Sequence, residues 1–439
     1  MEKNQEWESG TPSGADIPVF RIPAPVAYAL DRLGGAGYEC YLIGGCVRDF
    51  LRGEIPHDYD LTTSALPDEV HRVFSGEHLI DSGLRHGTVT LVRDGMTLEI
   101  TTYRRDGAYL DGRHPEAVEY TSSLREDAAR RDFTMNAVAY HPAEGIRDYF
   151  GGEADIRAHR IRAVGCADKR FSEDALRILR ALRFAAVLGF SVEEETAKAI
   201  HRGAEGLRRI SAERIQSELQ RMLCGGHVGA VVRDFQDVLA PVLSPWYEAV
   251  TQGTRSDIDL PALLPALAPD PVLRAAGFFL PLAESKEGLA DVEALMRRLR
   301  YDRRSMTRVL KLLSHLSEPC TGSLPVLRRF LAALGPVDAP LLLALRIAVE
   351  KTSAAPDAEH VRALEEATHT LQELCSGRAV CTLSDLAVGG RDLMAVGFPR
   401  GERLGRVLQA LFAAVLDGEV ENERERLLAY ARRRFGNSE

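Results

Sequence analysis

Residues 41–63 read Tyr41-Leu-Ile-Gly-Gly-Cys-Val-Arg-Asp-Phe-Leu-Arg-Gly-Glu-Ile-Pro-His-Asp-Tyr-Asp-Leu-Thr-Thr63, and no other segment says more about how the chain folds. The apolar run Cys40–Ile43 is typical of a buried strand, and the residues from Val47 to Leu51 are typical of a short helix. Gly44 and Gly45 stand between them and predict a tight turn. Because glycine lets a ligand approach the backbone N–H groups where a helix begins, this turn is a candidate phosphate site.

Two aspartates, Asp58 and Asp60, stand one residue apart near the end of this segment. In a strand, residues i and i+2 point to the same face, so a strand here would place two carboxylates side by side. Two such charges stay ionised when a cation lies between them, and oxygen ligands near a phosphate site favour Mg²⁺. This combination is typical of phosphoryl or nucleotidyl transfer. An Asp-x-Asp pair also occurs in solvated loops and in sugar transferases, so the pair alone leaves these alternatives open.

The composition indicates an ordinary soluble globular protein. The chain has 439 residues, of which 45% are hydrophobic and 27% are charged, which leaves room for roughly two to four domains. We find no apolar run that approaches the length of a membrane span and no signal-peptide pattern at the polar N-terminus. We therefore expect a disordered leader over residues 1–17 and a cytoplasmic protein with no membrane association.

The spacing of the cysteines and the net charge of the chain argue against several further classes of protein. The seven cysteines are scattered without a Cys-x-x-Cys pair, which argues against a disulfide framework and a zinc site. The net charge of -9 argues weakly against a protein coated with nucleic acid. Residues 157–221 nevertheless carry fourteen Lys and Arg against nine Asp and Glu, so this segment is the best candidate for contacts with a phosphate backbone.

The pattern of apolar residues divides the chain into an α+β head and an all-helical remainder. From about residue 171 onward, Leu, Ala, Arg and Glu recur at helical spacing to the end. Pro-rich residues 257–271 predict a loop between helices. We predict a head over residues 18–165, a neck over 166–223, a body over 224–335 and a tail over 336–439. The strands expected in the head are Cys40–Ile43, Tyr59–Thr62, Thr88–Val92 and Leu98–Thr102, with a hairpin turn at Gly95 between the last two.

Glu99 is the candidate for a third acid. Its neighbours Leu98 and Ile100 are apolar, so alternation places Glu99 on the opposite face of its strand. If this strand lies beside the one that carries Asp60, Glu99 joins the two aspartates and could polarise an attacking hydroxyl. The alternative is a glutamate on a half-exposed strand that faces solvent.

Two further segments concentrate charged side chains. In Arg130-Arg-Asp-Phe-Thr-Met-Asn-Ala137, the forked guanidinium of an arginine such as Arg131 suits triphosphate oxygens, and Asp132 suits ribose hydroxyls. The alternative is a charged helix start. In Ser172-Glu-Asp-Ala-Leu-Arg-Ile-Leu-Arg-Ala-Leu-Arg-Phe184, we predict a helix capped by Ser172.

On that helix, Asp174 and Arg177 are three residues apart and hence neighbours, and Arg180 and Arg183 continue the row. An ion pair on a solvated helix would explain the first two. The sharper interpretation is that a carboxylate beside a guanidinium presents an acceptor and donors together, which could read the edge of a nucleobase without a nucleic-acid template.

Together these motifs resemble the class II tRNA nucleotidyltransferases and bacterial poly(A) polymerases, which belong to the polymerase-β-like nucleotidyltransferases. The likeness covers about residues 41–223 and rests on Gly-Gly-x-Val-Arg-Asp with Asp-x-Asp, on Arg-Arg-Asp-Phe-Thr-x-Asn-Ala, and on Glu-Asp-x-x-Arg-x-x-Arg-x-x-Arg-Phe. A weaker likeness to the CCA-adding members continues through residues 389–401 and 416–422.

The resemblance implies a polymerase-β-like head with a small mixed sheet, followed by a helical neck, body and tail. It implies that the tRNA 3′-hydroxyl attacks the α-phosphate of CTP or ATP, with two Mg²⁺ ions and release of pyrophosphate, while the helical parts hold the tRNA by backbone and shape. No protein partner is required. The implied site consists of Asp58 and Asp60 as metal ligands, Glu99 as third acid, Gly44, Gly45 and Arg48 at the triphosphate, Arg131 and Asp132 at phosphate and ribose, Asp174 and Arg177 as the protein template, and Arg180 and Arg183 as its support.

Within the family, two segments favour complete CCA addition. Residues 103–115 resemble a loop that members adding only CC lack, and residues 83–91 resemble CCA-adding members more than poly(A) polymerases. An A-adding enzyme is the nearest alternative, followed by a poly(A) polymerase. A tRNA-binding protein without activity would have no use for three carboxylates together, and a sugar transferase would have no use for the Asp174–Arg177 pair.

Overall fold

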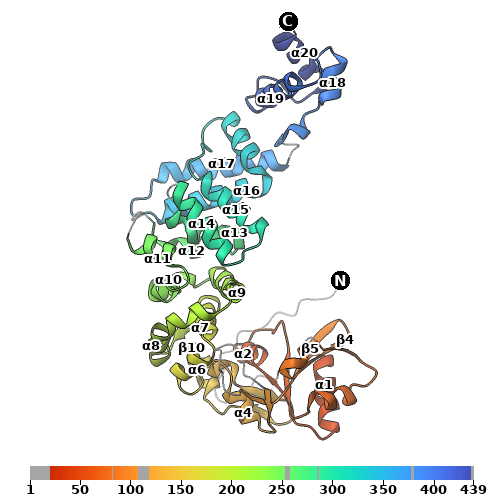
Figure 1. The fold of residues 1–439 in the computed structure, drawn as a ribbon, viewed down its shortest axis with the longest axis vertical. Helices are drawn as coiled ribbons and strands as arrows, with labels where there is room; N and C mark the ends of the chain where they lie inside the picture. Colours follow the sequence, from red (N-terminus) through yellow and green to blue (C-terminus); the bar gives the residue numbers. More distant parts are fainter. Residues whose placement is uncertain are drawn as a thin grey trace, which may run out of the picture. The chain divides into compact units, whose positions relative to one another are not determined.

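The structure is a computed structural model that describes residues 20–81, 83–106, 118–252, 258–283, 286–376 and 380–436. The chain forms two compact units, one of residues 1–181 and 190–210 and the other of residues 182–189 and 211–439. Figure 1 shows the strands in the first unit and the helices of the second. The expected leader and most of the loop at 103–115 lie outside the described residues, and the four-part division stays a prediction.

The first unit is built on one mixed sheet, as predicted. Its seven strands lie in the order β3-β4-β5-β2-β1-β8-β9. All neighbours are antiparallel except β2 and β5, which are parallel. The hairpin between β4 and β5 turns at Gly95, where φ is 77°, which confirms the predicted turn. The strands are β1 (Cys40–Ile43), β2 (Asp60–Thr63), β3 (His78–Ile80), β4 (Thr88–Arg93), β5 (Met96–Thr102), β8 (Ala139–His141) and β9 (Gly145–Arg147).

The two faces of this sheet differ in chemistry. One face buries Leu61, Leu98 and Ile100, and α1 (Ala24–Gly35) and α3 (Pro67–Val73) pack against the strands. The other face carries polar side chains at the centre of the sheet, including Asp60 and Glu99. Because side chains alternate along a strand, the apolar residues that anchor β2 and β5 also fix the direction of these acids.

Short elements complete the first unit and surround the polar face. Two small sheets pair β6 (Arg104–Asp106) with β7 (Val118–Tyr120) and β10 (Arg160–Ile161) with β11 (Ser191–Val192). Among the described residues, the remaining helices of this unit are α2 (Gly45–Leu51), η1 (Leu84–His86), α4 (Leu124–Ala129), η2 (Thr134–Asn136), α5 (Gly152–Arg157), α6 (Ala167–Glu173), α8 (Glu194–Gly203), η3 (Ala204–Arg209) and the beginning of α7 (Leu176–Leu188).

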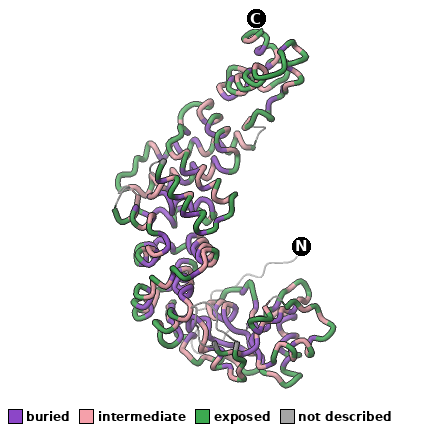
Figure 2. Tube along the Cα trace, in the orientation of Figure 1, coloured by how far each residue is buried: buried purple, intermediate pink, exposed green. Residues whose placement is uncertain are grey.

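In the second unit, every regular element among the described residues is a helix. Figure 2 shows that buried residues follow the inner faces of these helices. The main helices are α9 (Ala212–Leu223), α10 (Val228–Phe235), α11 (Ser244–Thr251), α12 (Leu260–Ala266), α13 (Pro271–Phe279), α14 (Lys286–Arg298), α15 (Arg303–Ser314), α16 (Leu324–Thr352), α17 (Ala358–Ser376), α18 (Gly390–Ala395), α19 (Glu402–Leu416) and α20 (Arg424–Phe435).

Two expectations for this unit are wrong. The predicted Pro-rich loop contains helix α12, because Pro261 lies in the first turn, where no N–H is needed, and Asp259 caps the helix by accepting a hydrogen bond from Ala262 N (3.1 Å). Helix α16 is long and apolar enough to span a membrane by length and composition, although no such run was expected. Of its apolar window, 44% is buried inside the unit, and Gly335 (φ 77°, ψ 167°) interrupts the helix.

Candidate active site

Asp60 and Glu99 lie side by side on the polar face of the sheet. Strands β2 and β5 are parallel neighbours, and their register pairs Asp60 with Glu99. Leu98 and Ile100, which flank Glu99, are fully buried, while Glu99 is exposed. The adjacency on which a role for Glu99 depends is therefore present, and the predicted direction of Glu99 is confirmed.

Asp58 reaches this face differently from the prediction. Strand β2 begins at Asp60, so Asp58 lies in the preceding loop, where it is exposed, and strand alternation does not apply to it. The reason is that β1 ends at Ile43 and the chain turns at Gly44, so the antiparallel partner ends opposite the start of β2.

The three carboxylates interact through their charges. Burial raises the pKa of Asp60, the nearby Glu99 and Asp58 raise this pKa further, and Arg131 opposes them. Burial is therefore the main cause of the raised pKa, and the charge of Arg131 opposes the repulsion from Glu99 and Asp58. A divalent cation would relieve this repulsion.

The carboxylates of this site suit Mg²⁺ if the substrate supplies further ligands. Among the described residues, no group of three or more His, Cys, Asp or Glu is already arranged to hold a metal ion. Mg²⁺ commonly takes only one or two carboxylates from the protein and fills its octahedron with water and substrate phosphate oxygens. Asp58 and Asp60 offer this pair of hard oxygen ligands.

The turn at Gly44 brings the predicted phosphate site against Asp60. Gly44 is buried with φ 88° and ψ −136°, a conformation that favours glycine. A Cβ atom at this position would lie 3.2 Å from Arg131 Nη1 and 3.7 Å from Asp60 Oδ2. The turn that opens α2 at Gly45, the acid and a guanidinium therefore meet at one point.

Arg48 is buried and fixes α2 to the segment after α4. Its Nη1 donates to Asn136 Oδ1 (3.0 Å), and its Nε and Nη2 contact Asp49 Oδ1 at 2.9 and 2.8 Å. The structure thus places Arg48 behind the turn, as part of a polar network that joins α2 to η2.

Arg131 is held by a buried acid that the sequence analysis missed. Its Nη2 lies 3.5 Å from Oδ2 of Asp127, which belongs to α4 and is completely buried. Asp127 also pairs with Arg130 (2.8 Å). The available signal was the spacing, since Asp127 precedes these two arginines by three and four residues on one helical turn.

Asp132 is buried and already engaged by protein groups. It accepts hydrogen bonds from Phe133 N (2.8 Å) and Asn136 Nδ2 (3.0 Å), and Arg180 binds its other oxygen through Nε and Nη2 at 2.7 and 2.6 Å. Burial alone would raise its pKa, but Arg180 and these donors lower the pKa to about 2. Asp132 and Arg180 therefore form an ion pair that ties α7 to the head.

The predicted continuous helix around Asp174 is wrong. Helix α6 ends at Glu173 and α7 begins at Leu176, with Asp174 in an extended conformation (φ −144°, ψ 103°) between them. Ser172 is not a cap; it lies in the last turn of α6, where its hydroxyl donates to Lys169 O (2.8 Å). Asp174 takes the capping role, because its Oδ1 accepts from Leu176 N (3.0 Å).

Arg177 is buried, so it is not part of an ion pair on a solvated helix face. It pairs with Glu173 (2.7 Å) and donates to the carbonyl oxygens of Arg170 (3.0 Å) and Arg130 (3.1 Å). These bonds hold its guanidinium in one orientation. Arg183, further along α7 in the second unit, pairs with Glu218 of α9 (2.5 Å) and lies over the Phe184 ring (3.9 Å).

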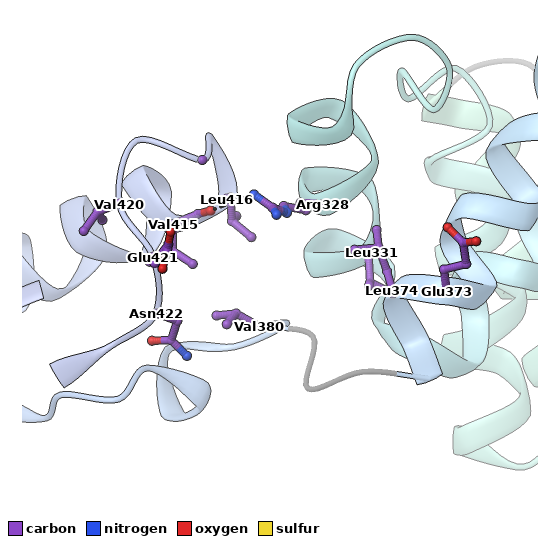
Figure 3. Close-up of a pocket in the computed structure, with 11 residues that line it drawn as sticks. Arg328, Leu331, Glu373, Leu374, Val380, Val415, Leu416, Val420, Glu421 and Asn422 are labelled. Carbon is purple, nitrogen blue, oxygen red and sulfur yellow. Dashed lines mark hydrogen bonds between the residues drawn. The ribbon is translucent and has the colours of Figure 1, made fainter. Parts of the chain in front are cut away.

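A cavity of about 390 Å³ occurs in the second unit, where side chains from α16, α17 and residues 415–422 face one another (Figure 3). Its lining includes Arg328, Leu331, Val415 and Asn422. Its lining contains none of the predicted site residues.

Comparisons with known proteins agree along nearly the whole chain. The model described as "Poly A polymerase head domain" matches residues 40–162, "Probable RNA and SrmB-binding site of polymerase A" matches residues 189–238, and tRNA nucleotidyltransferase domain 2 matches residues 285–431. The CCA-adding enzyme of Geobacillus kaustophilus is 38% identical, with 90% of this chain and 93% of that protein covered. The enzyme of Geobacillus thermodenitrificans is 35% identical, with 93% and 96% covered.

A solved structure of a relative has a similar fold. The Bacillus stearothermophilus CCA-adding enzyme in complex with CTP superposes with a TM-score of 0.77 at 32% identity, and 94% of this chain and 98% of that chain are covered.

Proposed function

This chain belongs to the family of CCA-adding enzymes, and from that premise we propose that it adds C, C and A to the 3′ end of tRNA, with CTP and ATP as substrates. The family, the enzyme class and the α+β fold expected from the sequence are confirmed. One observation on this chain supports the proposal most strongly. The register of β2 and β5 places Asp60 beside Glu99, and Asp60 also lies close to the Gly44 turn and Arg131.

In this proposal Asp58 and Asp60 bind Mg²⁺. When bound, the metal would neutralise charge at the phosphates and would lower the pKa of the attacking 3′-hydroxyl. Glu99 extends from the neighbouring strand as the third acid and orients that hydroxyl by accepting its hydrogen bond. Removing either aspartate leaves the remaining carboxylates without a complete set of metal ligands.

The triphosphate lies over the turn formed by Gly44 and Gly45. Arg131 supports it from the side, and its Nε is buried with no hydrogen-bond partner among the described side chains. Arg48 acts from behind the turn, because its bonds to Asp49 and Asn136 hold α2 in place. Asp132 serves the nucleotide chiefly through its ion pair with Arg180, rather than as an open acceptor for the ribose.

The base is read by Asp174 and Arg177 in place of a nucleic-acid template. A protein template must hold its donors and acceptors still, since mobile groups would accept several bases. The cap to Leu176 N orients the Asp174 carboxylate, and Glu173 with two carbonyl oxygens orients the Arg177 guanidinium. Arg180 and Arg183 lie in the middle of α7 and anchor this helix through their ion pairs with Asp132 and Glu218.

The tRNA is held by the helical parts through its phosphate backbone and shape. The residues that match the polymerase RNA-binding model overlap the Arg-rich segment 157–221. We place the protein in the cytoplasm, without a required protein partner, as expected for an enzyme that acts on tRNA.

The test is primer extension on three tRNA transcripts that end before CCA, at C and at CC, each with Mg²⁺ and labelled CTP or ATP. Addition of C to the first two transcripts and of A to the third establishes complete CCA addition. Addition of A alone, and only to the CC-ended transcript, makes the protein an A-adding enzyme. A long A tail on any transcript makes it a poly(A) polymerase.

A further inference from the structure

We propose that Asp127 is a positioning residue that keeps the Arg131 guanidinium beside the nucleotide and limits its pairing with the metal ligand Asp60. The inference rests on the proposed function for the identity of the site. It adds a residue that touches neither substrate nor metal but sets where the phosphate-binding arginine points.

The two oxygens of Asp127 face different partners. Oδ1 pairs with Nε and Nη2 of Arg130, both at 2.8 Å. Oδ2 accepts a hydrogen bond from Thr62 Oγ1 (3.1 Å) and lies 3.5 Å from Nη2 of Arg131. Oδ2 therefore joins Arg131 to strand β2, while Oδ1 holds the carboxylate in place.

The Thr62 contact links this carboxylate to the catalytic strand. Thr62 follows Asp60 by two residues in β2, so the two side chains lie on the same face of the sheet. Arg131 Nη1 reaches the Gly44 turn on that face, where Asp60 Oδ2 is also close. One buried carboxylate thus connects the acid-bearing strand to the guanidinium beside it.

Charge explains why a carboxylate is needed at this position. Burial opposes ionisation of Asp127, but Arg130 and Arg131 outweigh it, so the pKa of Asp127 is lowered and the group stays charged. Arg131 has three acids within electrostatic reach, of which Asp127 acts most strongly, followed by Asp60 and then Asp132. If Asp127 lost its charge, Asp60 would be the stronger attraction for Arg131, and the guanidinium would compete with Mg²⁺ for that acid.

The test is a double-mutant cycle on nucleotide binding. The full-length protein binds CTP in Mg²⁺ without tRNA, so no turnover occurs, and the dissociation constant is measured for wild type, Asp127→Asn, Arg131→Met and the double variant. We expect Asp127→Asn to weaken CTP binding about tenfold in the wild type, and by less than about twofold when Arg131 is already replaced. Asp127→Asn should also raise the Mg²⁺ concentration needed for half-maximal binding.

Arg130→Met is the matched control, because it removes the cation from the other oxygen of the same carboxylate. We expect its coupling to Asp127→Asn in CTP binding to stay below about twofold. Thr62→Val removes the hydroxyl at nearly constant shape and should weaken CTP binding in the same direction as Asp127→Asn, which keeps the inference testable if the aspartate variant does not fold.

Equal weakening by Asp127→Asn with and without Arg131 would reduce Asp127 to a general structural role and overturn the inference. So would unchanged CTP and Mg²⁺ affinity in both Asp127→Asn and Thr62→Val. The proposed function is judged separately by the wild type: a wild type that adds CCA while the cycle shows no coupling refutes only the inference, and a wild type that binds no CTP refutes both.

Discussion

At the scale of residues, the candidate site contains two aspartates, Asp60 and Asp132, whose environments differ. Asp60 is half-buried among other carboxylates, and its pKa is raised by burial, then by Glu99 and Asp58. Asp132 is buried opposite Arg180, and its pKa is lowered to about 2. A bound cation would therefore relieve the repulsion between Asp60 and its neighbouring acids. Asp132 stays ionised near neutral pH and stabilises the fold through its ion pair.

Replacing Asp60 by asparagine should reduce nucleotide addition on the order of 10³-fold or more, because a metal ligand is lost while side-chain shape is kept. Steady-state addition of C to tRNA measures the effect, and circular dichroism checks the fold. Near-normal turnover of this variant would show that the metal assignment is wrong.

Asp60 also predicts a pH dependence. Because its pKa is raised, protonation competes with metal binding at a higher pH than for an ordinary aspartate. Activity at low Mg²⁺ should therefore fall as the pH is lowered through the raised pKa, and higher Mg²⁺ should move this fall to lower pH. Rates measured across pH at two Mg²⁺ concentrations test this, and a profile that does not move with Mg²⁺ argues against Asp60 as a ligand.

Asp132 should make the stability of the fold sensitive to acid. A carboxyl with a lowered pKa in the folded state stabilises the protein above its unfolded pKa near 4, and this stabilisation is lost as the pH falls towards 2. Between pH 5 and 2 the wild type should lose about 2 kcal/mol more unfolding free energy than Asp132→Asn. Denaturant titrations at several pH values measure this, and parallel losses in both proteins would contradict the assignment.

At the scale of elements, the break between α6 and α7 is the main difference from the secondary structure predicted from the sequence. The pattern of Leu and Arg residues predicts one helix, but Asp174 ends the first helix and caps the second. The cap gives the carboxylate a fixed direction, which a residue in mid-helix would not have. If Asp174 reads the base as we propose, base selection and local stability depend on one side chain.

Two substitutions at Asp174 separate these roles. Asparagine also caps helices well, so Asp174→Asn should keep stability and change the choice between CTP and ATP, whereas Asp174→Ala should lose about 1 kcal/mol as well. Misincorporation rates and thermal unfolding measure the two effects. An Asp174→Asn enzyme with unchanged nucleotide choice would remove Asp174 from the template.

The sequence predicted elements best where one pattern dominates. The Gly44 turn, the β4–β5 hairpin and the direction of Glu99 follow from glycine and from strand alternation. The pairing of Asp60 with Glu99 required the sheet order, and the start of β2 required knowing that β1 ends at Ile43. Asp127 was missed because its importance comes from Thr62, a residue 65 positions away that only the fold brings close.

At the scale of the whole molecule, the mixed sheet presents the candidate acids and most of the other described elements are helices. The net charge is -9, yet residues 157–221 are locally basic. Segregation of this kind allows a local surface to bind RNA without general attraction to nucleic acid. The binding of tRNA should accordingly depend on salt far more than the binding of CTP does.

Measuring both dissociation constants between about 50 and 200 mM salt tests this difference. The logarithm of the tRNA association constant should fall linearly with the logarithm of salt concentration, with a slope set by the number of phosphates contacted. A tRNA slope as shallow as that for CTP would show that the helical parts do not hold the RNA through its backbone.

The most direct test of the central claim is to sequence the 3′ ends that the purified protein forms on a tRNA lacking CCA, with all four nucleoside triphosphates and Mg²⁺ present and no other protein. We expect tRNA 3′ ends with the added sequence CCA and no further nucleotide. G and U should be essentially absent, because side chains of the protein choose the base. Ends that carry a mixture of bases, a run of A, or no addition at all would contradict it.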